Sequence, residues 1–241
     1  AGFAIVMART DSVGESQAGA TLFLTRMDAP GITVGPEVGT YETAFAGGHP
    51  YVTFDRVFVA DDDVLGVPGG GFLAAQVRLA PARLTHCMRW LGLARRAHDI
   101  ALDRASAREM FGSRLADLGV AQAQLADNTI DIETSDAVIA HAVAALETDA
   151  RRGSHLAAVA KVHCSEAAWR VIDRAVQLCG GDGVTSHLPL IGYLNEVRAF
   201  RIYDGSNETH RWAIARRDVK GRERAVAAGA PRLDIAQVSH D

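Results

Sequence analysis

The first sixty residues alternate short apolar runs with polar stretches, which is the pattern of β structure. The segments that read as strands are 3–8, 21–25, 32–34 and 51–59. The turn sequence Asp28-Ala29-Pro30-Gly31 separates the second strand from the third. Four short strands make an incomplete sheet whose edges need pairing or covering. The pattern therefore predicts a partial antiparallel β domain over residues 1–66, and we expect the chain to begin inside that domain.

The pattern becomes helical after the triple glycine at 69–71. A helical run covers 72–108, and Pro81 predicts a kink or a fresh helix start within it. The next helix carries an apolar seam with a seven-residue period, formed by Leu118, Leu125, Ile132, Ile139 and Leu146. Small or short residues follow three positions later, at Ala121, Asn128, Ser135 and Ala142. This spacing is typical of a helix in a bundle, and Gly153 reads as its C-cap.

A third helix carries one apolar face, made of Ala160, Cys164, Ala167, Val171, Ala175 and Leu178. The glycine-rich segment 180–183 ends that helix, a short helix follows Pro189, and a last helix covers 207–220. We therefore predict an α+β chain in which the partial β domain precedes an all-α, up-down four-helix bundle over 67–220. The tail 221–241 has weak periodicity, and we expect it to be extended or loosely packed.

Composition narrows the function classes. The chain has 241 residues, a net charge of −4 and a pI near 6.1, which disfavours a basic nucleic-acid-binding face. No apolar run approaches the roughly 20 residues that span a bilayer. Three widely spaced cysteines give neither a disulfide framework nor a metal-ligand motif, so we expect a reducing, cytoplasmic location and no bound metal.

Three motifs carry candidate chemistry, and each also has an ordinary structural interpretation. The segment 179–183 permits close backbone approach to a ligand, but it equally reads as a helix end followed by a turn. The segment 203–210 contains two carboxylates and also reads as a helix start with Ser206 or Asn207 as the N-cap. The segment 108–112 reads as an ordinary helix terminus.

Taken together and in this order, the motifs resemble the flavin-dependent acyl-CoA dehydrogenases from residue 4 to about residue 220. The motifs that carry the resemblance are Phe54-Asp55-Arg56-Val57, Val64-Leu65-Gly66, Gly70-Gly71-Phe72, Arg83, Arg108-Glu109-Met110-Phe111-Gly112, Leu125-Ala126-Asp127, Gln177-Leu178-Cys179-Gly180-Gly181-Asp182-Gly183 and Tyr203-Asp204-Gly205-Ser206. The segment His86-Cys87-Met88-Arg89 and the set Asp204, Glu208 and His210 look most like the branch that in animals is fused to a kinase-like domain.

The resemblance implies a role for each matching residue. Asp204 stands where most of the family has its catalytic glutamate base. The residues matching FAD-contacting positions are Arg108, Phe111, Gln122, Gln177, Gly180, Gly181, Ser206 and Glu208. The residues matching the acyl-CoA site are Arg83, Tyr203 and Gly205. A carboxylate in a water-poor pocket has a raised pKa and can remove a carbon-bound proton.

Three departures from the family pattern bear on these roles. The candidate base is an aspartate, whereas most of the family has a glutamate. Some members carry the base on the long helix instead, but this chain has Ala82 at that position, which cannot act as a base. Asp204 is therefore the first candidate and Glu208 the second. Gly119 stands where many members have a cofactor-contacting glutamine, which leaves Gln122 as a replacement one turn on. The family's N-terminal helical domain and the first part of its β domain have no counterpart here, so we expect the missing half on another chain or lost from a fragment.

The implied function is FAD-dependent α,β-dehydrogenation of an acyl-CoA thioester to the trans-2-enoyl-CoA. By resemblance, an electron-transfer flavoprotein is the expected acceptor, and the expected assembly is a homotetramer or a heteromer that supplies the missing half. Two alternatives stay open. One is an acyl-CoA oxidase-like relative on the same scaffold, and the other is a non-catalytic bundle subunit of a heteromeric complex.

Overall fold

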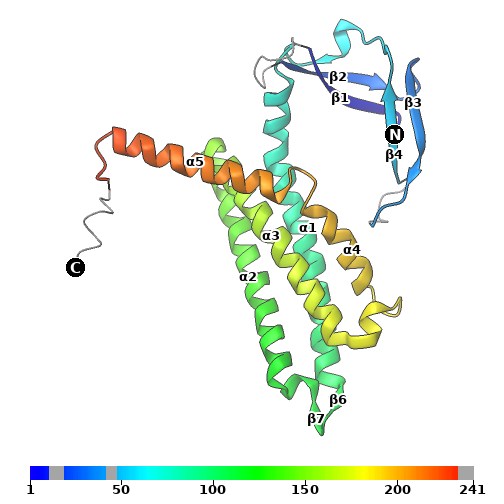
Figure 1. The fold of residues 1–241 in the computed structure, drawn as a ribbon, viewed down its shortest axis with the longest axis vertical. Coiled ribbons are helices and arrows are strands. Elements are labelled where there is room, and N and C mark those ends of the chain that lie inside the picture. Colours follow the sequence, from blue (N-terminus) through cyan, green and yellow to red (C-terminus); the bar gives the residue numbers. More distant parts are fainter. Residues whose placement is uncertain (11–18, 42–47, 233–241) are drawn as a thin grey trace.

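A computed structural model describes residues 1–10, 19–41 and 48–232. The molecule is elongated, with the β structure at one end of a bundle of long helices (Figure 1). The structure is α+β, as the sequence predicts. The last residues of the predicted tail, 233–241, lie outside the described residues.

The β part contains two separate antiparallel sheets among the described residues. Strand β2 (Ala20–Arg26) lies between β1 (Phe3–Arg9) and the short β5 (Val64–Leu65), and β3 (Ile32–Val38) pairs with β4 (His49–Phe54). A 3₁₀ turn, η1 (Asp61–Asp63), precedes β5. The four predicted strands form, but the fourth ends at Phe54 rather than at residue 59. The chain leaves the ladder there because Arg56 adopts a left-handed backbone conformation with a φ of 51°.

The first long helix, α1 (Gly71–Ala107), runs through Pro81 without a break, so the predicted helix start at Pro81 is wrong. Pro81 is exposed, and the carbonyl of Val77 that loses its helical partner is therefore open to water. At its start the helix touches the sheet. A Cβ atom on Gly71 would lie 2.9 Å from the backbone of β2, so glycine is required where α1 meets that strand.

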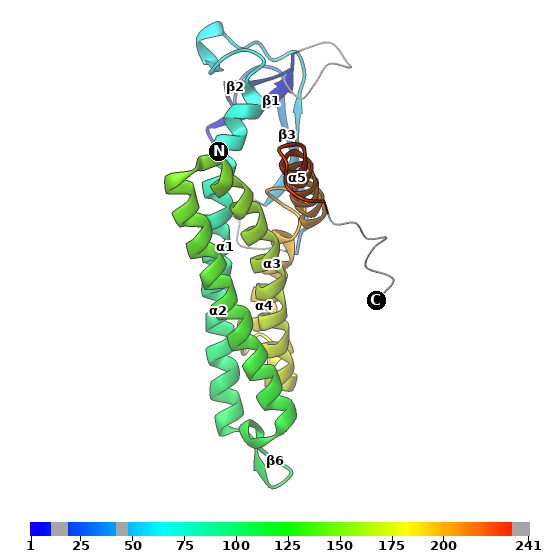
Figure 2. The same ribbon diagram turned by 90° about the vertical axis from the view of Figure 1, so that its left-hand side faces the viewer.

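Helices α2 (Gly119–Thr148) and α3 (Ala150–Cys179) pack against α1 and against each other, antiparallel in sequence order (Figures 1 and 2). The predicted stripe of short side chains is fully buried between them, at Ala121, Asn128, Ser135 and Ala142. The predicted C-cap at Gly153 is wrong. The chain turns at Asp149, whose carboxylate accepts hydrogen bonds from the backbone N–H groups of Arg151 and Arg152. Gly153 lies in the first turn of α3, where a Cβ would come within 2.5 Å of the Leu146 Cα.

Between α1 and α2 the chain forms a small hairpin, with β6 (Glu109–Met110), β7 (Ser113–Arg114) and a 3₁₀ turn η2 (Leu115–Asp117). After α3 come the 3₁₀ turn η3 (Gly180–Val184) and the shorter helix α4 (Leu190–Phe200), which packs on α3 and α1 and completes the four-helix bundle.

The last helix, α5 (Asn207–Ala227), lies crosswise to the bundle in Figure 1 and is seen end-on in Figure 2. It continues past the predicted boundary at residue 220, so the segment up to Ala227 is helical rather than extended, while all of residues 221–227 except Val226 are exposed. The extra turns contain Arg, Glu and Ala, which favour helix without an apolar stripe.

Candidate active site

Asp204 lies in the loop between α4 and α5, which is held in a backbone conformation that few residues adopt. Asp204 has a φ of 54° and Gly205 a φ of 92°, both in the left-handed region. The carbonyl of Asp204 accepts hydrogen bonds from Arg83 Nε at 3.1 Å and from His210 Nε2 at 3.0 Å. Two donors on one carbonyl fix the orientation of this peptide and hence the direction of the Asp204 side chain.

Gly205 is required by the same packing. A Cβ on Gly205 would lie 2.8 Å from His210 Nε2, the atom that binds the Asp204 carbonyl. Burial lowers the pKa of His210, and the hydrogen bond to the Asp204 carbonyl opposes this effect. A neutral His210 that donates from Nε2 is the tautomer that this contact needs.

A fully buried lysine of α3 supports the loop that carries Asp204. Lys161 Nζ on α3 donates to the Gly205 carbonyl at 2.8 Å and to Asn207 Oδ1 at 2.8 Å. Ser165 and Asn207 are also buried and exchange hydrogen bonds. Burial lowers the pKa of Lys161 to about 8. The sequence analysis did not single out Lys161, although it shares a helical face with the buried residues Ser165, Ala168 and Ile172 at four-residue or three-residue spacing.

The Asp204 carboxylate faces α1. Its side chain is 20% exposed, and Oδ2 is buried and accepts no hydrogen bond from any residue that the structure describes. The His86 ring lies closest, with Nε2 at 3.3 Å from Oδ2. Burial lowers the pKa of His86, the charge of Asp204 opposes that shift, and Arg89 and Arg78 add to it. At neutral pH Asp204 therefore faces an uncharged imidazole and keeps a free lone pair.

Tyr203 is anchored beside this pair. Its hydroxyl accepts hydrogen bonds from Trp90 Nε1 at 2.6 Å and from Arg89 Nη2 at 3.1 Å. Its ring meets the His86 ring edge-on, with centroids 5.1 Å apart. Residues from α1, from the loop and from α3 thus build one site around Asp204.

The two predicted cofactor residues that follow the loop differ in their surroundings. Ser206 is the N-cap of α5, and its hydroxyl accepts a hydrogen bond from the Thr209 N–H. The Glu208 side chain is 78% exposed, lies in the first turn of α5 and has Arg211 at 3.8 Å. The carboxylate of Glu208 points to solvent, whereas that of Asp204 is enclosed.

Five of the six remaining predicted cofactor residues gather at the other end of the bundle, around a pocket of about 650 Å³. Its lining includes Arg108, Phe111, Gln177, Gly180 and Gly181. Gln122 is exposed and lies outside the lining, whereas Gln124 belongs to it. Sequence reasoning missed Gln124; the start of α2 at Gly119 decides which glutamine faces the pocket.

The two groups of residues are far apart in one chain. Arg83 lies beside Asp204, and Arg108 caps the far end of the same helix, 25 residues later. At 1.5 Å per residue, α1 separates them by roughly 37 Å. The Asp204 site and the Arg108 pocket are therefore two distinct sites on this chain.

A family model described as "Acyl-CoA dehydrogenase, C-terminal domain" matches residues 69–218. The chain belongs to the acyl-CoA dehydrogenase family. Over 231 residues it is 32% identical to Acyl-CoA dehydrogenase family member 10 of Mus musculus. This alignment covers 95% of this chain and 22% of the mouse protein. The structure of butyryl-CoA dehydrogenase from Megasphaera elsdenii aligns with a TM-score of 0.81 at 27% identity over 91% of this chain and 56% of that one.

A chain in the structure of the electron transferring flavoprotein of Acidaminococcus fermentans aligns with a TM-score of 0.78 at 28% identity, over 90% of this chain and 56% of that one. This chain thus spans about half the length of those solved structures and about a fifth of the mouse relative. The resemblance inferred from the sequence motifs is confirmed at the level of the family. Homologues in the acyl-CoA dehydrogenase family are FAD-dependent flavoproteins.

The Arg108 pocket has the chemistry that such a cofactor needs. Phe111 has a left-handed backbone conformation, with a φ of 52°. Its side chain is 90% exposed and offers a free aromatic face. Gln124 Oε1 is buried without a hydrogen-bond partner among the described residues. A Cβ on Gly180 or Gly181 would meet nothing within 4 Å, so the backbone there is open to a ligand. A guanidinium for phosphate oxygens, an aromatic face and an unpaired amide fit the pyrophosphate and adenine end of FAD.

No helix among the described residues has the length and apolar content that a membrane span requires. The same residues contain no group of three or more His, Cys, Asp or Glu side chains placed to hold a metal ion.

Proposed function

We propose that this chain takes part in FAD-dependent α,β-dehydrogenation of an acyl-CoA thioester, with Asp204 as the catalytic base. The observation that carries the proposal is the enclosed Oδ2 atom of Asp204, which accepts no hydrogen bond from the described residues and faces a His86 ring whose pKa burial lowers. A carboxylate oxygen without a hydrogen-bond donor is a better proton acceptor than a solvated one. Asp204 would receive the α-proton of the thioester on its carboxylate.

The surrounding residues orient that oxygen. Arg83 and His210 hold the Asp204 carbonyl, and Lys161 holds the next carbonyl, so the side chain leaves the loop in one direction. Such preorganisation removes the need to reorient the base during proton transfer. FAD, when bound, supplies the acceptor for the β-hydrogen. Glu208, the second candidate for the base, is disfavoured because its carboxylate is solvated and paired with Arg211.

FAD binding would use residues from more than one copy of the chain. Arg108 would bind the pyrophosphate, Phe111 would cover the adenine, and Gln177 with Gly180 and Gly181 would complete the pocket. Because roughly 37 Å of α1 separates this pocket from Asp204, the two sites of one chain would serve different cofactors. This arrangement supports a homotetramer, or a heteromer of the same shape, with FAD at a subunit interface.

The proposal extends to the electron acceptor. The aligned chain from the Acidaminococcus fermentans electron transferring flavoprotein structure supports an electron-transfer flavoprotein as the partner that reoxidises the cofactor. An acyl-CoA oxidase-like relative would pass the electrons to O₂ instead. Reoxidation in air, compared with reoxidation by an added electron-transfer flavoprotein, separates the two.

The test is anaerobic bleaching of the flavin absorption band by a panel of acyl-CoAs. Because the chain spans 56% of the butyryl-CoA dehydrogenase chain, it is assayed alone and with the remaining length of a full-size relative supplied. Asp204→Asn should retain FAD and acyl-CoA binding but lower flavin reduction by several orders of magnitude, since it removes a group that acts in the transition state. Glu208→Gln is the matched control, and its flavin should be reduced at close to the wild-type rate. The reverse order of the two variants would transfer the role to Glu208.

A further inference from the structure

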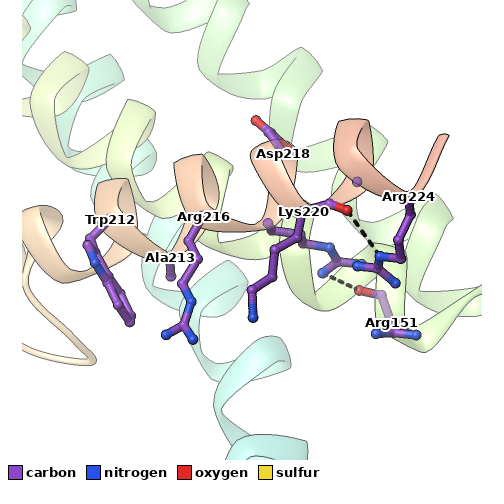
Figure 3. Close-up of a pocket in the computed structure, with 9 residues that line it drawn as sticks. Arg151, Trp212, Ala213, Arg216, Asp218, Lys220 and Arg224 are labelled. Atoms are coloured by element: carbon purple, nitrogen blue, oxygen red, sulfur yellow. Dashed lines mark hydrogen bonds between the residues drawn. The ribbon is translucent and has the colours of Figure 1, made fainter. Parts of the chain in front are cut away.

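A basic groove lies between α5 and the first turn of α3, and none of its lining residues belongs to either of the sites described above. It has a volume of about 810 Å³, and five cationic side chains line it: Arg151, Arg216, Arg217, Lys220 and Arg224 (Figure 3). A volume of this size is within the range of small-ligand sites. The chain as a whole has a net charge of −4, so this concentration of positive charge is local to the groove.

The cations in the groove form no close ion pair with a carboxylate among the described residues, although the charge of Arg217 acts on Asp149 at longer range. Within the part of the chain that the structure describes, no ion pair of 4 Å or less involves Arg151, Arg216, Arg217, Lys220 or Arg224. The carboxylate of Asp218, which also borders the groove, points to the opposite side of α5 from Arg216 and Lys220 (Figure 3). There it lies 3.9 Å from His155 Nε2. Asp149 caps α3 through the backbone N–H groups of Arg151 and Arg152.

Two contacts within the groove fix its shape. Arg217 Nη1 donates to the Arg151 carbonyl at 3.0 Å, which ties α5 to the start of α3. Arg224 Nε donates to the Lys220 carbonyl at 3.1 Å, which leaves its Nη groups for another acceptor. Arg216, Lys220 and Arg224 follow one another at four-residue spacing, so they step along α5 by roughly 6 Å each. The groove thus presents a row of cations on a rigid support.

An aromatic side chain stands at the head of this row. Trp212 is 61% exposed, four residues before Arg216, and its indole points to the same side of α5 as Arg216 (Figure 3). The Arg216 guanidinium lies 5.0 Å from the centre of the indole ring. An exposed indole with a neighbouring cation offers a platform for stacking a planar ring.

We propose that this groove binds a nucleoside polyphosphate, with the base on Trp212 and the phosphates along Arg216, Lys220 and Arg224. Guanidinium groups bind phosphate oxygens in pairs, and an ammonium supplies a further point charge. An acidic peptide would use the cations but not the exposed indole, so the arrangement favours a ligand that has both a flat ring and several phosphates. The site is independent of the proposed dehydrogenation.

The test is calorimetric titration of the chain with magnesium-free ATP, tripolyphosphate and adenosine at low salt. ATP should bind one equivalent, adenosine should not bind detectably, and tripolyphosphate should bind at least about fivefold more weakly than ATP because it lacks the stacked base. The Arg216→Gln/Lys220→Gln double variant should weaken ATP binding at least roughly tenfold, because it removes two charge-assisted contacts. Trp212→Leu should reduce ATP affinity to that of tripolyphosphate.

Two control variants locate the binding. Arg222→Gln removes a cation from the same helix. The Arg222 side chain donates a hydrogen bond to the Pro231 carbonyl and does not line the groove, so ATP affinity should not change. Arg95→Gln removes an exposed cation of α1 that pairs with Asp136, and it should also leave ATP affinity unchanged.

Arg108→Gln alters the pocket at the far end of the bundle and shows whether any of the measured binding takes place there instead. The proposal is overturned if ATP does not bind, if Arg108→Gln removes binding while the double variant does not, or if tripolyphosphate binds as tightly as ATP in both the wild type and Trp212→Leu.

Discussion

The Nε2 atom of His86 lies 3.3 Å from the Oδ2 atom of Asp204, so each group sets the electrostatic surroundings of the other. Burial lowers the pKa of His86, and the Asp204 charge partly opposes this shift. The positive charges of Arg89 and Arg78 lower the pKa of the His86 ring further. Asp204 is the one contributor that raises it, which makes the His86 ring a reporter of the charge on the proposed base.

We predict that Asp204→Asn lowers the pKa of His86 below its wild-type value, because the opposing negative charge is removed and the burial remains. The measurement is an NMR titration of the imidazole resonances, with the His86 signal assigned by its loss in His86→Gln. The pKa of His155, which lies beside Asp218 instead, should not move. An unchanged or raised His86 pKa in Asp204→Asn would contradict the proximity of the two groups.

Gly205→Ala should lower both stability and flavin reduction. The added Cβ would lie 2.8 Å from His210 Nε2 on a residue with a φ of 92°, so the loop has to shift or His210 has to release the Asp204 carbonyl. The left-handed backbone alone costs about 1–2 kcal/mol for a residue other than glycine. Urea unfolding measures the cost. Gly192→Ala is the control, because its Cβ would meet nothing within 4 Å inside α4 and should stabilise by about 0.5–1 kcal/mol.

Lys161→Met should destabilise the chain and disorder the Asp204 loop. The substitution keeps an unbranched side chain of similar length but leaves the Gly205 carbonyl and Asn207 Oδ1 without their lysine donor. An unsatisfied buried acceptor costs about 1–3 kcal/mol. Lys220→Met, the same change at an exposed position, should alter the unfolding free energy by less than about 0.5 kcal/mol. Equal unfolding midpoints for the two variants would show that Lys161 does not support the loop.

The helical bundle could be predicted from the sequence because its periodicity is strong. The seven-residue seam and the short residues beside it locate α2, and Ile132 and Ile139 are buried as that spacing requires. The C-cap predicted at Gly153 is wrong because a glycine near a helix end can serve either of two purposes. It can adopt a positive φ that ends the helix, or it can allow a close contact with a neighbouring helix. Its contact with Leu146 depends on how α2 and α3 approach each other, which local sequence does not determine.

The candidate site was predicted less completely because its supporting residues come from distant segments. Lys161 escaped notice since lysine is almost never fully buried, and its partners Gly205 and Asn207 belong to another part of the chain. The left-handed conformation of Asp204 could not be anticipated either, because aspartate adopts it only when surrounding contacts impose it. Arg108, Phe111, Gln177, Gly180 and Gly181 line one pocket, and the role in FAD binding that the resemblance implies for them stays a prediction.

The stability of the bundle should fall in acid because of a buried carboxylate between α2 and α3. Asp131 accepts hydrogen bonds from both Arg170 and Arg174, including Arg174 Nη1 at 2.8 Å. Burial raises the pKa of Asp131, but the two guanidinium groups outweigh it and leave the pKa below its usual value. A carboxylate with a lowered folded-state pKa stabilises fully above its unfolded pKa, near 3.9, and loses this contribution as pH falls through the folded value.

Asp131→Asn should therefore lose about 1–2 kcal/mol of unfolding free energy at pH 7, and its deficit relative to the wild type should shrink below about pH 4. Chemical denaturation at a series of pH values measures both quantities. Asp136→Asn removes an exposed carboxylate of the same helix that pairs with Arg95, and it should change stability by less than about 0.5 kcal/mol at every pH. A deficit for Asp131→Asn that grows toward acid would reverse the sign of this argument.

Complementation between two inactive variants should reveal whether FAD is shared between copies. Asp204→Asn removes the proposed base and Arg108→Gln removes the proposed pyrophosphate contact, and roughly 37 Å of helix separates the two positions in one chain. If one cofactor uses Arg108 of one copy and Asp204 of another, a mixed oligomer contains some sites with both wild-type residues. Co-refolding the two variants should then restore part of the flavin reduction by acyl-CoA that neither variant shows alone, whereas mixing without refolding should not. If each chain supplied both groups to its own cofactor, every site in the mixture would carry one of the substitutions and no activity would return.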